Sequence, residues 1–124
     1  MNRWLKGIAF FLLFLLIVGG VFMAPKFGRV RRSKEVVLQQ NLWTIRRAIE
    51  FYASDKGKRP QSFDDLVSAG YLREIPADPF AGSNKTWIIE REKESSAPSA
   101  NPGIIDVRSG ATGADKDGKP YNKY

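Results

Sequence analysis

An uncharged apolar run near the N-terminus constrains this chain more than any other feature. The 17 residues from Ile8 to Ala24 contain no charged side chain. A helix of this length is about 26 Å long, slightly shorter than the ~30 Å hydrocarbon core of a bilayer. Arg3 and Lys6 precede the run, and Trp4 suits the membrane interface. The run therefore predicts a segment that enters a membrane.

Such a run is typical of a cleaved secretory signal, a permanent anchor or the stem of an assembling protein. A secretory signal needs small residues before its cleavage site. A cut after Ala24 would place Phe22 three residues before it and Pro25 directly after it, which favours an anchor. The positive-inside rule favours a cytoplasmic C-terminal part, because two basic residues precede the run and five follow it. The five are Lys26, Arg29, Arg31, Arg32 and Lys34.

Composition argues against catalysis and leaves the choice of an anionic partner open. The chain has no cysteine and no histidine, which removes disulfides, thiolates and the usual general base. The pair Asp64 and Asp65 is explained by helix capping, and the carboxylates near residue 90 by a solvated strand end. The net charge of +7 favours anionic surfaces. Because the basic run follows the apolar run, anionic lipid is favoured over nucleic acid. We expect no enzyme.

The apolar pattern after Pro25 predicts an amphipathic helix, which we call the stem. Five apolar residues recur at steps of four, three, four and three and form one face, the core stripe. They are Leu38, Leu42, Ile45, Ile49 and Tyr52. We expect Val36, Val37, Trp43, Ala48 and Phe51 to widen this face, and Gln39, Arg46, Arg47 and Glu50 to lie mainly on other faces. Pro25 either kinks a continuous helix or ends its first segment, and Gly57 ends the stem.

The remaining residues predict a small α+β head. Ser62 is the expected N-cap of a short helix that Gly70 ends. Residues 86–90 and 103–109 read as strands of an antiparallel hairpin, separated by a polar loop. The tail from Gly110 is Gly-rich and loop-like, and Trp87 and Tyr71 are expected in the core with Trp43, Phe51 and Tyr52.

These elements predict an α+β fold in which a long N-terminal helix carries a short helix and a small antiparallel sheet. The helix serves as membrane anchor and amphipathic stem. The expected divisions are a basic leader at residues 1–7, a transmembrane helix at 8–24, the stem at 25–57 and the head at 58–124.

The order of these pieces resembles a known family. In "IRRAIEFYASDKGKRPQSFDDLVSAGYLREIPADPF" the stem leads into a Lys-Gly-x-x-Pro turn, a short Leu-containing helix, Gly-Tyr-Leu and Pro-x-Asp-Pro. Residues 34–109 resemble the globular region of type II secretion major pseudopilins and their type IV pilin-like relatives. The resemblance implies a structural subunit that packs through its apolar helix into a pseudopilus.

The same resemblance assigns expected roles to three N-terminal residues. Prepilin peptidase would cut after Gly7, and the new amino group of Ile8 would be methylated, where the family usually has Phe. Leu12 occupies the place of the family's Glu, whose carboxylate pairs with a neighbouring subunit's N-terminal ammonium. Leu12 cannot form that pair, and Pro25 falls earlier than the usual stem proline. These departures suit a minor, tip-like pseudopilin or a diverged homologue. Alternatively, Gly7 is simply the last residue before an anchor.

Four residues near the C-terminal end form a candidate calcium site. Asp106, Ser109, Asp115 and Asp117 offer oxygen ligands of the kind that calcium prefers, and Gly118 favours a turn. Major pseudopilins bind calcium in a C-terminal loop, so the resemblance supports this site. Lys116 and Lys119 in the same loop would oppose a cation, and a solvated Asp-Gly turn is the alternative.

The sequence thus predicts a pseudopilin-like subunit of a type II secretion or type IV pilus-like machine. The expected partners are other pseudopilins or pilins, the secretion assembly platform, prepilin peptidase and the inner membrane. The expected location is the bacterial inner membrane, with one span and the head in the periplasm. The alternative is a single-pass membrane protein that does not polymerise and whose basic head binds lipid, DNA or a protein partner.

Overall fold

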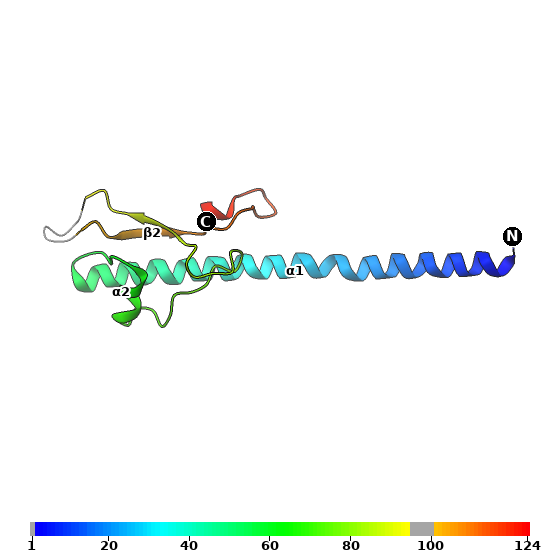
Figure 1. The fold of residues 1–124 in the computed structure, drawn as a ribbon, viewed down its shortest axis with the longest axis horizontal. Helices are drawn as coiled ribbons and strands as arrows, with labels where there is room; N and C mark the ends of the chain where they lie inside the picture. Colours follow the sequence, from blue (N-terminus) through cyan, green and yellow to red (C-terminus); the bar gives the residue numbers. More distant parts are fainter. Residues whose placement is uncertain (1, 95–100) are drawn as a thin grey trace. The chain divides into compact units, whose positions relative to one another are not determined.

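The computed structural model describes residues 2–94 and 101–124, except for the side chains of residues 21–27 (Figure 1). The described elements are the helix α1 (Arg3–Lys56), the helix α2 (Phe63–Ser68), the strands β1 (Ile88–Arg91) and β2 (Ile104–Arg108), and the 3-10 helix η1 (Tyr121–Lys123). This is the predicted α+β fold. The chain forms two compact units, residues 1–33 and 34–124. Most of the predicted polar loop after Glu94 lies outside the described residues.

The helix α1 runs without interruption through Pro25. Of the two expectations for Pro25, the one that ended the first helical segment there is therefore wrong. At its C-terminus α1 ends as predicted. Gly57 adopts a left-handed conformation with φ of 68°, and its N–H donates to the Ala53 carbonyl at 3.0 Å. Glycine enters this region of backbone space without a steric penalty.

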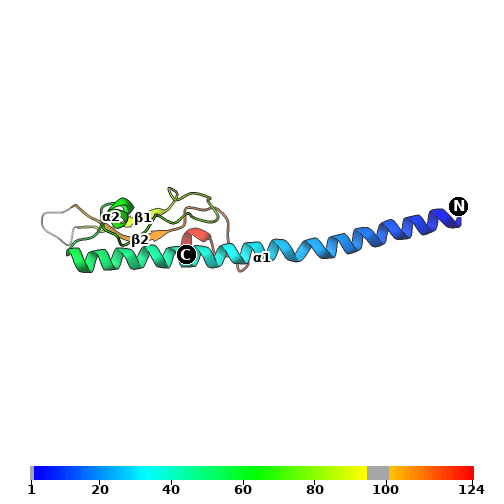
Figure 2. The same cartoon turned by 90° about the horizontal axis from the view of Figure 1, so that it is seen from below.

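The core of the second unit forms on one face of α1, and the predicted core stripe is confirmed. All five of its residues are buried, and Leu38, Ile45 and Ile49 are completely inaccessible. In Figures 1 and 2, α2 and the hairpin both lie alongside the half of α1 that carries these residues. They supply the other side of the core. The side chains that pack against the stripe include Phe63, Leu66, Leu72, Trp87, Ile104, Val107 and Tyr121.

The short helix α2 begins with the capping that the sequence predicts. Ser62 Oγ accepts from the Asp65 N–H at 3.3 Å, and the Asp65 carboxylate accepts from the Ser62 N–H at 3.2 Å. This reciprocal arrangement satisfies donors that a helix start otherwise leaves unpaired. After α2, Gly70 takes a φ of 83°, as suits the glycine expected to end the helix, and Leu72 turns back into the core. Capping and reversal together hold Phe63 and Leu66 against the core.

The hairpin pairs β1 with β2 antiparallel, with Ile89 opposite Val107. The ladder begins at Ile88 rather than at the predicted Thr86. Trp87 is buried before the ladder starts, and its indole Nε1 donates to the Pro76 carbonyl at 2.8 Å. Here the backbone also passes close to Gly110, where a Cβ atom would collide with the Thr86 carbonyl oxygen. This close approach explains the glycine after β2.

The C-terminal tail is more ordered than the predicted loop. Ala114 and Pro120 form an isolated antiparallel bridge, and η1 follows it. Tyr121 is buried and stacks on Phe80 with ring centroids 4.0 Å apart. The glycine content predicted a loop, but the tyrosines after Gly118 anchor the tail to the head through their buried apolar area.

Candidate assembly surfaces

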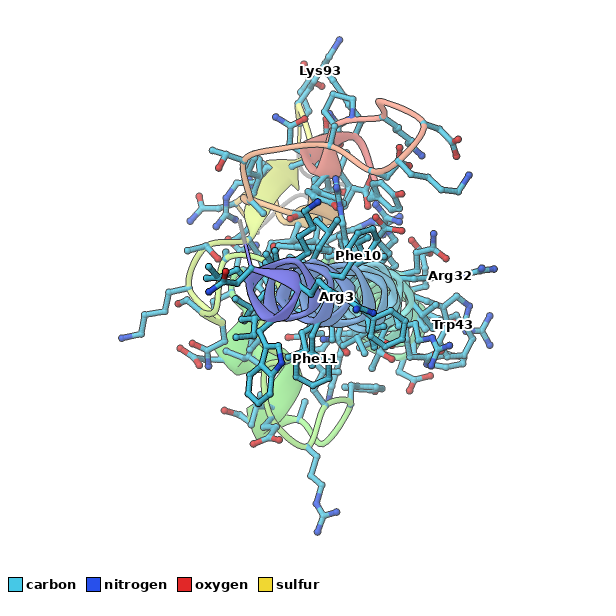
Figure 3. All side chains as sticks on the ribbon, turned by 90° about the vertical axis from the view of Figure 1, so that its right-hand side faces the viewer. Arg3, Phe10, Phe11, Arg32, Trp43 and Lys93 are labelled. Atoms are coloured by element: carbon cyan, nitrogen blue, oxygen red, sulfur yellow. The ribbon has the colours of Figure 1, made fainter. Side chains whose placement is uncertain are left out.

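The first candidate surface is the apolar start of α1. Residues Arg3–Gly20 have a mean hydropathy of 1.8, and none of them is buried in the structure. By length and composition this is the one helix in the described part of the chain that can cross a membrane. Phe10 and Phe11 leave α1 in different directions in the view along the helix (Figure 3). Every residue from Phe10 to Ile17 is apolar and exposed, and successive helix positions turn by about 100°, so apolar side chains surround this part of the segment.

The residues with predicted roles in processing and assembly all lie in this segment. Ile8 is 54% exposed and Leu12 is 55% exposed. Gly7 lies inside α1, and a Cβ atom placed there would meet nothing within 4 Å. Neither packing nor a left-handed backbone requires a glycine at this position. Glycine nonetheless lowers helix stability by ~1 kcal/mol relative to alanine.

The second candidate surface lies on α1 away from the core and corrects a sequence prediction. Trp43 and Phe51, expected in the core, are 58% and 51% exposed. The guanidinium of Arg47 lies 5.5 Å from the Trp43 ring centroid and 4.8 Å from that of Phe51. Residues four apart share a helix face, so the three side chains stack along one side. Val36 and Val37 are also exposed, whereas Ala48 is buried as predicted.

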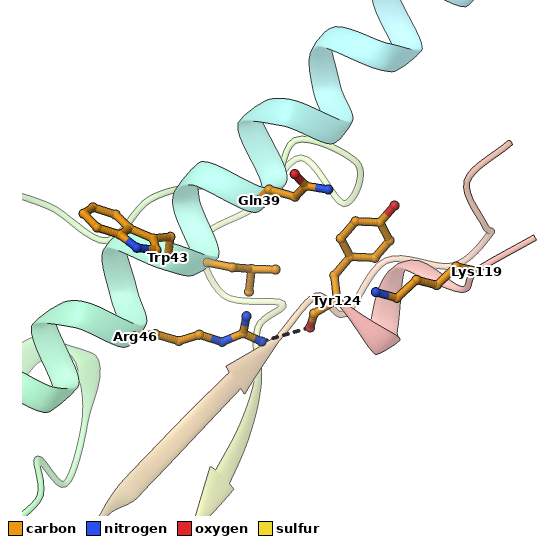
Figure 4. Close-up of a pocket in the computed structure, with 6 residues that line it drawn as sticks. Gln39, Trp43, Arg46, Lys119 and Tyr124 are labelled. Carbon is orange, nitrogen blue, oxygen red and sulfur yellow. Dashed lines mark hydrogen bonds between the residues drawn. The ribbon is translucent and has the colours of Figure 1, made fainter. Parts of the chain in front are cut away.

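A shallow pocket of about 350 Å³ lies beside Trp43, between α1 and the C-terminal tail (Figure 4). It is lined by Gln39, Leu42, Trp43, Arg46, Lys119 and Tyr124. Arg46 was expected mainly on another face of the stem, but it joins three elements. Its Nε donates to Asp106 at 2.8 Å, and its Nη2 donates to the main-chain oxygens of Val107 and Tyr124 at 2.9 and 3.0 Å. These bonds fasten β2 and the tail to α1.

Two ionisable groups of the C-terminal tail, Tyr124 and Asp115, have shifted pKa values. The Tyr124 hydroxyl donates to Asp115 at 2.6 Å, and this bond to the carboxylate raises the pKa of Tyr124 to about 12. The same bond is the main cause that lowers the pKa of Asp115. The backbone N–H groups of Lys119 and Asp117 also donate to Asp115 and act in the same direction. The hydrogen bond behind both shifts joins Tyr124 to the turn that Asp115 caps.

The four predicted calcium ligands have separate partners in the structure. Asp106 binds Arg46, and the buried Ser109 donates its hydroxyl to the buried Asp78. Asp115 caps the turn before η1, and Asp117 contacts Lys116 at 2.9 Å. Within residues 2–94 and 101–124, no three acidic side chains gather as they would around a metal ion. Calcium binding stays a prediction.

Two sets of contacts that hold the head together, those of Asp78 and of Arg46, are not predicted from the sequence. Asp78, the acid of the Pro-x-Asp-Pro motif, is completely buried and accepts from the N–H groups of Phe80 and Ala81 as well as from Ser109. An aspartate between two prolines is a turn signal, and it could have indicated the contacts of Asp78. The sequence carries no signal for the contacts of Arg46.

Comparisons of the chain with protein-family models, with curated proteins and with solved structures give no match.

Proposed function

We propose that this protein is a pseudopilin-like structural subunit of a type II secretion or type IV pilus-like machine. Its apolar helix resides in the inner membrane and, on assembly, in the filament core. The head faces the periplasm. The action is mechanical, because subunits pack by their apolar helices and the growing pseudopilus pushes a substrate or holds a partner.

The observation that carries the proposal is the double use of one helix. The first 18 residues of α1, Arg3–Gly20, are predominantly apolar, and none of them is buried within the structure. Its later residues provide the core stripe of the α+β head. A soluble protein rarely exposes so large a contiguous apolar surface, which marks a membrane or assembly contact. A pilin-like subunit needs a helix whose apolar start sits in the membrane before assembly and packs against other subunits after it. The same helix must also carry the folded head, as the later part of α1 does.

Gly7 supports the peptidase step of the proposal. The structure gives no steric reason for glycine there, although glycine weakens a helix. A small residue without a Cβ suits recognition by a peptidase that cuts directly after it. Arg3 and Lys6 precede it as a basic leader, and Ile8 would become the methylated first residue.

Leu12 defines the position that the subunit would take in a filament. A cut after Gly7 creates an ammonium group, and burying that group unpaired in an apolar filament core costs several kcal/mol. Leu12 provides no carboxylate to neutralise it on a neighbouring copy. A tip subunit has no subunit ahead of it to neutralise. The protein would therefore act at a tip or beside a partner pilin that carries the Glu.

N-terminal sequencing and intact mass of the protein from its native membrane test the proposed processing. A start at N-methyl-Ile8 is expected. An intact Met1 would contradict the peptidase step and favour the non-polymerising membrane protein.

Imaging of sheared surface fibres tests the assembly step. Overexpression with the peptidase and assembly platform is expected to give no long fibres of the unaltered protein, and Leu12→Glu is expected to restore them. Leu13→Glu is the matched control, because Leu13 is equally exposed at 55% but lies one residue away. Long fibres of the unaltered subunit alone would overturn the tip assignment, and equal fibres from both variants would exclude a specific role for position 12.

A further inference from the structure

The net positive charge of this chain lies in its N-terminal third. Residues 1–34 hold seven of the 20 Lys and Arg residues and none of the 13 Asp and Glu residues. Residues 35–124 therefore hold 13 of each, and the net charge of +7 belongs entirely to the apolar segment and its flanks. The head is electrically balanced. An anionic partner attracted by the net positive charge would thus bind next to the apolar segment.

Three of these cations, Arg29, Arg31 and Arg32, lie on α1 after the apolar run and are exposed. We call them the basic collar. Arg29 is five residues beyond Ala24, which corresponds to about 7.5 Å along a helix. The polar layer on each side of a bilayer is roughly 5–8 Å thick. If the apolar run spans the hydrocarbon core, the collar begins at headgroup level.

The arrangement of the collar around the helix distinguishes between partners. Successive residues of an α-helix are turned by about 100°, so Arg29 and Arg32 share one face, whereas Arg31 points to nearly the opposite side from Arg29. Figure 3 shows Arg32 projecting outward from the helix, away from Phe10 and Phe11. One partner helix contacts one face and would reach only part of such a set. Lipid headgroups surround a membrane helix on every side and can contact all three.

We infer that the basic collar binds anionic phospholipid headgroups around α1 at the membrane surface. Guanidinium groups donate paired hydrogen bonds to phosphate, and juxtamembrane cations each contribute favourably near an anionic surface. The inference rests on the membrane segment of the proposed function, but it requires neither cleavage at Gly7 nor polymerisation. In a membrane with anionic lipid, the collar would hold the subunit at a fixed depth before assembly.

Electron spin resonance of the full chain in bilayers tests the inference. The chain is reconstituted in phosphatidylcholine with trace spin-labelled phosphatidylglycerol or spin-labelled phosphatidylcholine, and the motionally restricted fraction of each lipid is measured. The protein is expected to prefer the anionic lipid roughly fivefold or more, the factor that one juxtamembrane cation contributes. Salt at about 1 M, where the screening length is ~3 Å, should greatly reduce the preference.

The triple variant Arg29→Gln, Arg31→Gln, Arg32→Gln is expected to lower this preference severalfold and leave the restricted phosphatidylcholine unchanged. The matched control, Lys58→Gln, Arg73→Gln, Lys85→Gln, removes three exposed cations from the head and should retain the preference. Equal preference in the two variants, or none in the unaltered protein, would overturn the inference. No restricted lipid of either kind would overturn it together with the membrane segment. N-terminal sequencing reports separately on the pseudopilin proposal, because it detects cleavage whatever the lipid result.

Discussion

Ile45 is completely buried in the middle of the core stripe, whereas Val36 on the same helix is 61% exposed. We expect Ile45→Ala to lower the free energy of unfolding by about 2–5 kcal/mol, because it removes buried methyl groups and leaves a cavity. Val36→Ala should change it by less than about 0.5 kcal/mol, since an exposed side chain loses little on truncation. Urea denaturation of the chain in detergent, followed by near-ultraviolet circular dichroism, measures both. Equal losses would mean that the buried face is assigned wrongly.

The Tyr124–Asp115 pair gives the head a pH dependence at both extremes. The pKa of Tyr124 is raised to about 12, so its contribution is fully present below pH 10 and is lost as pH rises through about 12. The pKa of Asp115 is lowered below 3.8, so its contribution is present above that pH and is lost as pH falls further. Asp115→Ala should return the pKa of Tyr124 toward 10.

Carbon NMR of the labelled tyrosine rings measures this change. Tyr71 provides an internal control, because its raised pKa comes mainly from its hydrogen bond to Asp55 and should not respond to the substitution. A Tyr124 pKa that stays near 12 in the variant would assign the shift to another cause.

At the scale of elements, α2 depends on its cap more than a longer helix would. It has six residues, and short helices are marginal without tertiary contacts and capping. Ser62→Ala should lower stability by about 1 kcal/mol, because the Asp65 N–H loses its acceptor. Ser62→Asn, which keeps a capping oxygen, should restore most of it. Thermal unfolding compares the two variants, and an equal effect of both would show that the cap contributes little.

The elements also show which local signals predict structure. The core stripe and the Ser62 cap follow from the sequence, because helical spacing and capping act between residues at most four apart. The sequence predicts a strand from Thr86, because β-propensity does not show where pairing begins. The structure starts the ladder at Ile88, since Trp87 turns into the core and bonds Pro76 instead.

At the scale of the whole molecule, orientation in the membrane is the decisive property. The count of basic residues favours a cytoplasmic head, but the pseudopilin proposal requires a periplasmic one. We expect the periplasmic orientation, because a dedicated secretion machine can maintain it against the charge bias. A reporter fused after Tyr124 should be active only in the periplasm. Activity only in the cytoplasm would contradict the secretion role, although the lipid contacts of the basic collar would remain possible there.

The sequence by itself determined the apolar segment, the amphipathic stem, the capped short helix and the α+β class. Each of these follows from the spacing of residues close together in the sequence, which does not depend on how the rest of the chain packs. Only the tertiary structure decided which side chains beside the core stripe are covered. It leaves Trp43 and Phe51 exposed because α2 and the hairpin pack elsewhere, and apolar character alone does not bury a side chain. It also gives Arg46 its partner Asp106, sixty residues away, and distributes the predicted calcium ligands among separate contacts. Pairings over such separations depend on how the elements pack, which helical and strand periodicity does not encode.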